Sequence, residues 1–330
     1  MTIDALATRR HYLDHLLPVW EALPAEHRGT LYVGGLLIGA HPEAVPQNAN
    51  LYRPGPRVLV AGQIDYQSVV TFRRAIWSHH GAGQSYGADP DPAVNRASSY
   101  AGGDNQGKTD LFLVPGPHPA ERTRQRYPHI PVVEVGCPAL DRWLNRERAP
   151  NIRPVVALAW HGDSPLCTET WTALPHFRSA LPDLARTYTV LGHSHPRGRN
   201  LLAPVYEEAG ITSVGYETVM DLADVLIVDN SSIGWEFAAT GWPVVWLTPP
   251  WYRNLNHGVR FGGDIGAEVR DPADLLGAVD DALAGRAPTP DLSRVYSHLD
   301  GRSAERAAAA IVALEEGRDP ETATRLEVLA

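Results

Sequence analysis

The sequence is poor in cysteine and lysine and has no long hydrophobic run. Its 330 residues include two cysteines, Cys137 and Cys167, which excludes a disulfide framework and a zinc site of four thiolates. Lysine occurs once, at Lys108, and the net charge of −9 argues against binding nucleic acid through a broad basic surface. The longest apolar run, Leu31 to Ala40, is too short to span a bilayer, and no signal peptide opens the chain. We therefore expect a globular cytoplasmic protein with no nucleic-acid partner.

What the chain does have is a regular alternation of short apolar segments with helical ones. With 44% hydrophobic and 20% charged residues, it can build cores for about two domains. Runs such as Val-Leu-Ile-Val lack polar alternation, which is typical of strands buried on both faces of a parallel sheet. The predicted strands are Leu31–Gly34, Arg57–Ala61, Ala75–Ser78, Asp110–Val114, Val132–Val135, Val155–Trp160, Thr187–Leu191, Thr212–Gly215, Val225–Val228 and Pro243–Leu247. The predicted helices are Leu6–Leu17, Thr170–Arg186, Ser232–Thr240, Pro272–Ala284 and Ser303–Glu316.

Strands that alternate with helices indicate βαβ units with right-handed crossovers. The charged, proline-bounded stretch Arg146–Pro154 is the best domain boundary. We therefore predict an α/β protein with two Rossmann-like doubly wound domains, residues 1–150 and 151–330, facing a central cleft.

The segment after the strand Val225–Val228 carries the clearest candidate binding residues. Asp229 ends the strand, and Ser231 or Ser232 could cap the following helix, whose first amides and hydroxyls would form an anion site. Glu236 follows about one turn later and could accept hydrogen bonds from sugar hydroxyls. Simple helix capping without a ligand is the alternative interpretation.

Two other strand ends in the second half carry polar side chains. His193 and His195 have a spacing that points both side chains the same way on a strand, and Arg197 follows them. Because no third ligand stands at a recognisable spacing, we expect no metal and instead expect these residues to bind a diphosphate. A polar loop with solvated arginines and no ligand is the alternative interpretation. His161 and Asp163 are further cleft candidates, although a structural turn explains them equally well.

In the first half, His79 and His80 end the predicted strand Ala75–Ser78, and Gly81 and Gly83 would let backbone approach a ligand. Neighbouring residues on a strand point to opposite sides, so one of the two histidines is expected to face the cleft. An unperturbed imidazole titrates near about 6.5, which suits a general base.

Several short motifs together resemble the CDP-glycerol glycerophosphotransferases of teichoic-acid synthesis, which have the GT-B fold. The matching segments are His80-Gly81, His195-Pro196, Asp229-Asn230-Ser231-Ser232 with Pro243, Gly136–Asp141, and Asp300-Gly301 with Arg306. The sequence departs from that family at Ser85, where a lysine is usual, and at Ala159–Asp163, where the second domain usually opens differently.

The resemblance implies a transferase that moves a glycerol-phosphate or glycosyl group from a nucleotide-diphosphate donor to a hydroxyl acceptor of a cell-surface polymer. It implies donor binding by the second domain and catalysis by His80 and His195, with His80 as general base and no cofactor. The acceptor could be membrane-linked, which would bring the protein to the inner membrane face. An ordinary nucleotide-sugar glycosyltransferase, a nucleotide-sugar 2-epimerase and a non-catalytic nucleotide-binding protein remain alternatives.

Overall fold

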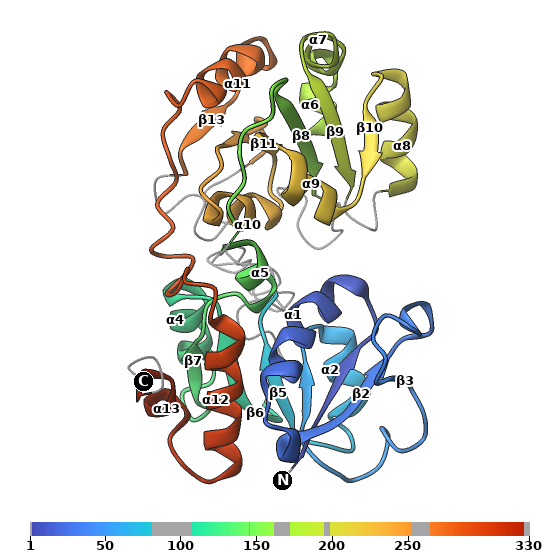
Figure 1. Ribbon diagram of the computed structural model, residues 1–330, viewed down its shortest axis with the longest axis vertical. Coiled ribbons are helices and arrows are strands. Elements are labelled where there is room, and N and C mark those ends of the chain that lie inside the picture. Colours follow the sequence, from blue (N-terminus) through green and yellow to red (C-terminus); the bar gives the residue numbers. More distant parts are fainter. Residues whose placement is uncertain are drawn as a thin grey trace. The chain divides into compact units, whose positions relative to one another are not determined.

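The computed structural model describes residues 2–80, 107–144, 146–161, 172–194, 199–252 and 265–326. The described chain forms two compact units (Figure 1). Unit 1 comprises residues 2–80, 107–144 and 293–326, and unit 2 comprises the described residues between 146 and 292.

Unit 1 is built on a parallel sheet of seven strands in the order β3-β2-β1-β4-β5-β6-β7. The strands are β1 (Ile3–Ala7), β2 (Arg28–Val33), β3 (Ala44–Pro46), β4 (Val58–Val60), β5 (Ala75–Ser78), β6 (Thr109–Val114) and β7 (Val132–Glu134). The α-helices are α1 (Arg10–Ala22), α2 (Gln63–Val69), α4 (Pro117–Arg126), α5 (Asp141–Leu144), α12 (Ser303–Glu315) and α13 (Pro320–Leu326), with short 3₁₀ turns η1 (Ala25–His27), η2 (Gly35–Leu37) and η3 (Pro138–Leu140).

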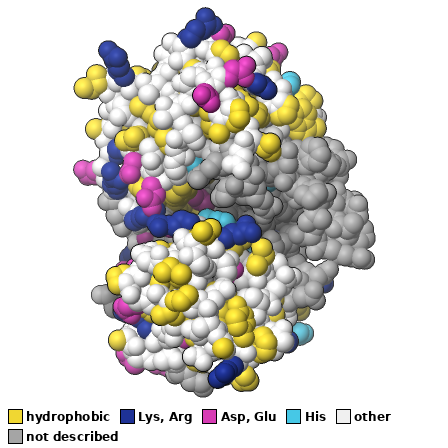
Figure 2. All heavy atoms as spheres, turned by 90° about the vertical axis from the view of Figure 1, so that its right-hand side faces the viewer, with side chains coloured by type: hydrophobic (Ala, Val, Ile, Leu, Met, Phe, Trp, Pro, Cys, Tyr) yellow, Lys and Arg dark blue, Asp and Glu magenta, His cyan; other side chains and the backbone are white. Residues whose placement is uncertain are grey.

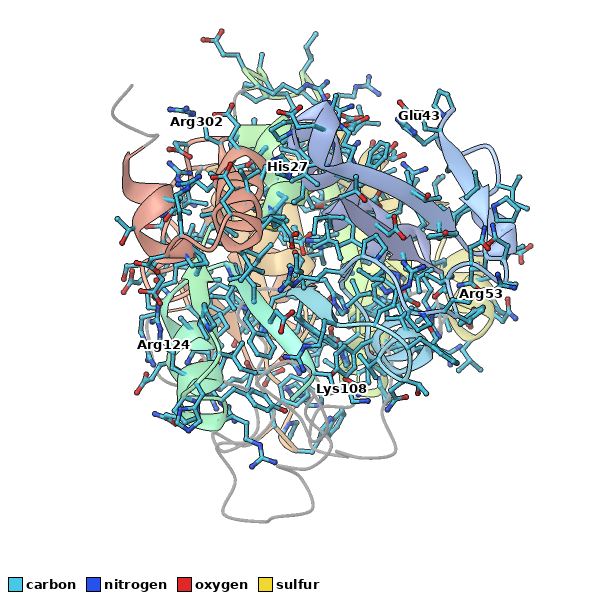
Figure 3. The ribbon with its side chains drawn as sticks, turned by 90° about the horizontal axis from the view of Figure 1, so that it is seen from below. His27, Glu43, Arg53, Lys108, Arg124 and Arg302 are labelled. Atoms are coloured by element: carbon cyan, nitrogen blue, oxygen red, sulfur yellow. The ribbon has the colours of Figure 1, made fainter. Side chains whose placement is uncertain are left out.

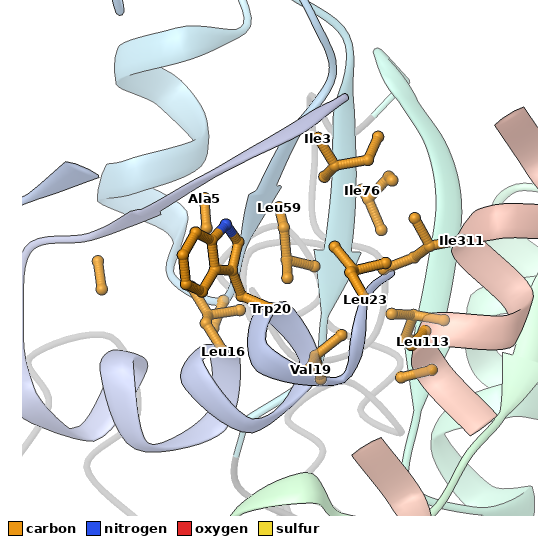
Figure 4. Packing of buried hydrophobic residues seen from close by; sticks show 14 of the residues in the cluster. Ile3, Ala5, Leu16, Val19, Trp20, Leu23, Leu59, Ile76, Leu113 and Ile311 are labelled. Carbon is orange, nitrogen blue, oxygen red and sulfur yellow. The ribbon is translucent and has the colours of Figure 1, made fainter. Parts of the chain in front are cut away.

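Two hydrophobic clusters cover the two faces of this sheet. On one face, Leu16, Val19 and Trp20 of α1 pack with strand residues such as Leu59, and Ile311 of α12 belongs to the same cluster (Figure 4). The other cluster joins alternate residues of the same strands to α2 and α4. Because side chains on a strand alternate between faces, both faces are covered and the strands read as continuous apolar runs.

Unit 2 has a parallel sheet of six strands in the order β10-β9-β8-β11-β12-β13. The strands are β8 (Val155–Trp160), β9 (Thr189–Ser194), β10 (Thr212–Val214), β11 (Val225–Val228), β12 (Val244–Leu247) and β13 (Ala267–Val269). The helical elements are α6 (Leu174–Phe177), η5 (Arg178–Ala180), α7 (Leu181–Thr187), α8 (Arg199–Glu208), α9 (Tyr216–Leu222), α10 (Ile233–Ala239), η8 (Pro272–Asp274) and α11 (Leu275–Leu283).

The chain returns to unit 1 after residue 292 and is held there by hydrogen bonds. The carboxylate of Asp141 accepts the amides of Ser303 (3.0 Å) and Ala304 (2.7 Å), so it caps the first turn of α12. The expected second domain, residues 151–330, therefore contains residues of both units, because α12 completes the apolar face of the first sheet. Sequence periodicity marks α12 as a helix but does not say which sheet it covers.

Two of the motif segments, Gly136–Asp141 and Asp300-Gly301 with Arg306, meet where the chain returns to unit 1. Arg306 pairs with the carboxylate of Asp300 and is 4% exposed. Gly136 has a φ of +87°, and a Cβ there would lie 2.4 Å from the Ser303 hydroxyl oxygen. These motif residues thus hold the C-terminal helix in unit 1.

The sheet strands agree closely with the sequence predictions, whereas the first helix does not. Ala75–Ser78, Val155–Trp160 and Val225–Val228 are strands with the predicted bounds. The predicted helix Leu6–Leu17 is wrong: Leu6 lies in β1, and the helix runs from Arg10 through Pro18 to Ala22. Proline removes one helix hydrogen bond, but the residues beyond it, including fully buried Val19, hold the helix on the core.

Charged side chains lie on several sides of unit 1, and hydrophobic side chains also reach the surface. The labelled cations Arg53, Lys108, Arg124 and Arg302 lie on different sides of unit 1 when it is seen from below (Figure 3). On the face drawn in Figure 2, hydrophobic side chains form small groups between polar atoms. Within the described ranges, every helix is too short or too polar to cross a membrane.

The packing of α12 predicts that a core truncation there destabilises unit 1. Ile311→Ala should lower the free energy of unfolding of unit 1 by roughly 2–5 kcal/mol, because Ile311 is fully buried. Hydrogen exchange read separately in each unit measures this. Leu201→Ala, at a side chain 78% exposed in unit 2, is the control. Equal loss of protection in both units would contradict the assignment of α12 to unit 1.

Candidate functional site

Each sheet has a topological switch point, where consecutive connections leave in opposite directions. In unit 2 it lies between β8 and β11, and in unit 1 between β1 and β4. Ligands of open parallel sheets bind at the carboxyl ends of strands at such points. The structure brings His161, His193 and Asp229 to the carboxyl ends of the adjacent strands β8, β9 and β11.

Asp229 is fully buried directly after β11. Its Oδ1 accepts the amide of His161 (2.7 Å) and its Oδ2 accepts the amide of Ala173 (3.0 Å). These two amides lie on either side of the connection between β8 and α6. The carboxylate expected to bind donor is thus engaged with backbone of its own unit.

Ser231 and Ser232 lie half-buried between β11 and α10. Ser232 occupies the N-cap position, but its backbone is already helical (φ −60°, ψ −24°) and its side chain makes no capping hydrogen bond. The expected capping by the Ser232 side chain is therefore not observed. The Ser231 carbonyl accepts the Gly234 amide instead (3.1 Å).

Helix α10 lies close against the strands that precede and follow it. A Cβ at Gly234 would lie 2.4 Å from the Trp246 ring and 2.8 Å from Cγ1 of Val228, so glycine permits this approach. Glu236 in the first turn is only 6% exposed. Its proposed contact with sugar hydroxyls stays a prediction.

Tyr206 of α8 holds the carboxyl end of β9 through a hydrogen bond. The Tyr206 hydroxyl donates to the carbonyl of His193 (2.8 Å), and a Cβ at Gly192 would lie 2.6 Å from the Tyr206 ring. Burial raises the pKa of Tyr206, and the charge of Asp229 raises it further, so the phenol stays protonated as a donor. His193 itself is half-buried. Glycine and tyrosine together therefore set the backbone that leads into the predicted His195 segment.

Five candidates, His195, Arg197, Asp163, Gly81 and Gly83, lie outside the described residues. His161 is half-buried directly after β8.

His79 and His80 in unit 1 lie on opposite faces of the sheet, as strand alternation predicts. His79 is 7% exposed and lies 6.4 Å from the Phe112 ring, on the face covered by α2 and α4. The His80 ring contacts Tyr12 of α1, with centroids 4.7 Å apart. Only His80 thus faces α1.

Histidines of α1 surround His80. Ring centroids of His11 and His15 lie 5.8 Å and 6.2 Å from that of His80, and Nδ1 of His15 lies 3.8 Å from Sγ of Cys137. Sequence reasoning missed these residues, although the spacing of His11 and His15 places them on one helix face. Among the described residues, no group of three or more His, Cys, Asp and Glu side chains has the geometry of a metal site.

Burial changes the acid–base properties of this cluster. It lowers the pKa of His80 to about 3, with His15 contributing, and lowers the pKa of His15 to about 3, with His11 contributing. The expectation that His80 titrates near about 6.5 is therefore wrong for the described structure, because charging the ring would cost its desolvation. Both rings are neutral at neutral pH.

A buried carboxylate also lies at the switch point of unit 1, between β1 and β4. Asp65 of α2 accepts the amide (3.0 Å) and the hydroxyl (2.5 Å) of Thr8, which follows β1. A Cβ at Gly62 would lie 2.2 Å from the Tyr12 ring. These contacts fix the beginning of α1, which carries His11 and His15.

The chain is similar in structure to several solved enzymes across nearly its whole length. A structure of the wall teichoic acid polymerase TagF matches with a TM-score of 0.57 at 12% identity, covering 96% of this chain and 89% of the chain in that structure. S. aureus MnaA in complex with UDP matches with 0.64 at 15% identity, covering 96% and 97%. A UDP-GlcNAc 2-epimerase from Methanocaldococcus jannaschii matches with 0.59 at 12%, covering 96% and 100%. No family model and no curated protein sequence matches.

Because the sequence identities are only 12% and 15%, the structural similarity shows the fold alone. Together with the two parallel sheets, it confirms the predicted GT-B-like architecture of two Rossmann-like units.

The buried histidines predict an acid-sensitive fold. Unfolded histidine binds a proton below about 6.5, whereas folded His15 stays neutral to about 3, so its contribution to stability is lost as pH falls below 6.5. The free energy of unfolding should fall by about 1.4 kcal/mol per pH unit for such a group. Urea titrations between pH 7.5 and 5 should show a shallower slope for His15→Asn than for wild type. An unchanged slope in His15→Asn, or an equal change in the control His129→Asn at an exposed position, would contradict the assignment.

Proposed function

We propose that the protein transfers a group from a nucleotide-diphosphate donor to a hydroxyl acceptor, with the donor bound by unit 2. The observation that carries the proposal is the convergence of His161, His193 and the Asp229–Ser232 segment at the carboxyl ends of β8, β9 and β11. This is where open parallel sheets bind ligands.

The structural neighbours support a nucleotide ligand. One structure of TagF was obtained by soaking with CDPG, and MnaA was solved with UDP. We propose a CDP-glycerol-like donor, because the His-Gly, His-Pro and Asp-x-Ser-Ser motifs together resemble glycerophosphotransferases.

The proposed donor contacts are the hydroxyls of Ser231 and Ser232 with His193, His195 and Arg197. Hydroxyl and imidazole N–H groups and a guanidinium donate hydrogen bonds to phosphate oxygens and offset the charge that develops on the leaving group. Such transfer depends mainly on positioning and charge stabilisation. No metal is required by this donor set.

In the proposed step, the acceptor oxygen attacks the distal phosphorus of the donor. A new phosphorus–oxygen bond forms, the bond to the bridging oxygen breaks, and CMP leaves with that electron pair. His80 takes the acceptor proton. Its lowered pKa keeps the ring neutral but makes it a weaker base. The negative charge of a bound phosphoryl group would raise that pKa and strengthen the base.

A nucleotide-sugar glycosyltransferase is the second candidate, because the same donor contacts would stabilise a leaving nucleoside diphosphate while attack falls on the anomeric carbon. The structural neighbours that are UDP-GlcNAc 2-epimerases favour the 2-epimerase alternative. That reaction needs carboxylates beside the sugar. Glu236 of α10 is one candidate for such a carboxylate, whereas Asp65 and Glu134, near the ends of β4 and β7, are engaged by Thr8 and by Arg124 (3.0 Å). We therefore place transfer first.

The donor assignment predicts weaker nucleotide binding in the double variant Ser231→Ala, Ser232→Ala. CDP-glycerol, CDP, UDP, UDP-GlcNAc and GDP are the probes for a thermal-shift comparison, since a ligand at a hundred times its Kd adds about 2.7 kcal/mol of stability. The shift given by the probe that binds wild type should shrink while the unliganded Tm stays within a few degrees. Ser179→Ala, at an exposed residue of η5, is the control. Unchanged affinity in the double variant would reject the serines as donor contacts.

The general-base assignment predicts different effects at the two adjacent histidines. His80→Ala should lower kcat roughly 10²–10⁴-fold and leave nucleotide affinity nearly intact, whereas His79→Ala should affect turnover far less. Steady-state rates and nucleotide titrations on both folded variants measure this. Reversed effects would transfer the role to His79, and full activity in both would contradict a catalytic role for this strand end.

A further inference from the structure

The carboxylate of Asp229 joins two segments of unit 2 that the proposed donor site needs. It belongs to the segment between β11 and α10 that carries Ser231 and Ser232. Through its two oxygens it also holds the amides of His161 (2.7 Å) and Ala173 (3.0 Å). One fully buried side chain therefore links the ends of β8 and β11 at the switch point.

The chemistry of this group argues against direct contact with a diphosphate. A carboxylate without a proton only accepts hydrogen bonds, and its charge would repel phosphate oxygens. Here two backbone N–H groups satisfy it from inside the unit. Losing the carboxylate would take this acceptor from a buried donor at Ala173 and a partly buried one at His161, which is costly in a low-dielectric environment.

We propose that Asp229 is a positioning residue for the nucleotide: it holds the end of β8 and the beginning of α6 against the segment that carries Ser231 and Ser232, and thereby sets the affinity of unit 2 for the donor. The proposal rests on the proposed function in that the donor binds at this strand end. It assigns to Asp229 a role through backbone, in place of the direct donor contact that its motif suggests.

The chain offers a matched control at the other end of the same strand. Asp224 precedes β11, is 4% exposed, and accepts the amides of Asn151 (3.1 Å) and Val155 (2.8 Å). Both aspartates thus flank β11, are buried and accept two backbone amides. Only Asp229 lies at the carboxyl edge, where ligands of such sheets bind.

The experiment compares Asp229→Asn with Asp224→Asn. An asparagine keeps one acceptor oxygen but turns an NH₂ group towards the other amide, so each variant loses one backbone hydrogen bond and the charge. Asp224→Asn also loses a hydrogen bond from the Asn151 side chain, so it is the more disruptive change of the two. Backbone exchange at His161 and Ala173, followed by hydrogen–deuterium exchange, should accelerate in Asp229→Asn and not in Asp224→Asn. Affinity for CDP-glycerol or UDP, whichever binds wild type, should fall about tenfold or more in Asp229→Asn and stay within about twofold in Asp224→Asn.

The two readouts separate the failure of this inference from that of the proposed function. Unchanged exchange at both amides, unchanged affinity, or an equal loss of affinity in the two variants would each overturn the positioning role. Wild type that binds none of the nucleotide probes would overturn the donor assignment and with it the effect on affinity, whereas the exchange result would still decide whether Asp229 holds the two ends. If Asp229→Asn does not fold, Asp229→Ser gives the same comparison with a smaller side chain.

Discussion

Hydrogen bonds from backbone amides to buried or half-buried carboxylates hold the segments on which the candidate site depends. Asp229 accepts two amides in unit 2. In unit 1, Asp65 accepts the amide of Thr8 just before α1, and Asp141 accepts two amides at the beginning of α12. A loop or helix that begins beside a buried sheet leaves amides without partners, each costing about 1–3 kcal/mol if unpaired. A carboxylate placed there satisfies those amides and at the same time fixes where the following polar side chains lie.

Much of the sheet architecture could be predicted from the sequence, because central parallel strands are buried on both faces and read as apolar runs. Val155–Trp160 and Val225–Val228 show this. The shorter outer strands β3 and β13 are only partly apolar, so the sequence pattern does not predict them. The end of β1 falls within the predicted helix Leu6–Leu17 because the apolar residues around Leu6 fit both the helix and the strand period. The return of α12 to unit 1 depends on tertiary contacts of Asp141 and Ile311 that no local pattern encodes.

For the site, the sequence could place His161, His193 and Asp229 at strand ends, and the sheet order then brings those ends together. It could not give their roles. Asp229 accepts from backbone, the Ser232 side chain does not cap its helix, and His80 packs among His11, Tyr12 and His15 with a lowered pKa. Each of these depends on groups distant in the chain, and a pKa depends on burial, which a motif does not reveal.

The central claim is that unit 2 binds a nucleotide at the carboxyl ends of β8, β9 and β11. Hydrogen–deuterium exchange of the wild-type protein with and without CDP-glycerol, repeated with UDP, tests this most directly. Nucleotide should slow exchange in peptides containing His161, His193 and Ser231, and should leave unchanged the exchange of peptides containing Asn151 and Asp224 at the amino edge of the same sheet. Protection confined to the amino edge or to unit 1, or no protection with either nucleotide, would contradict it.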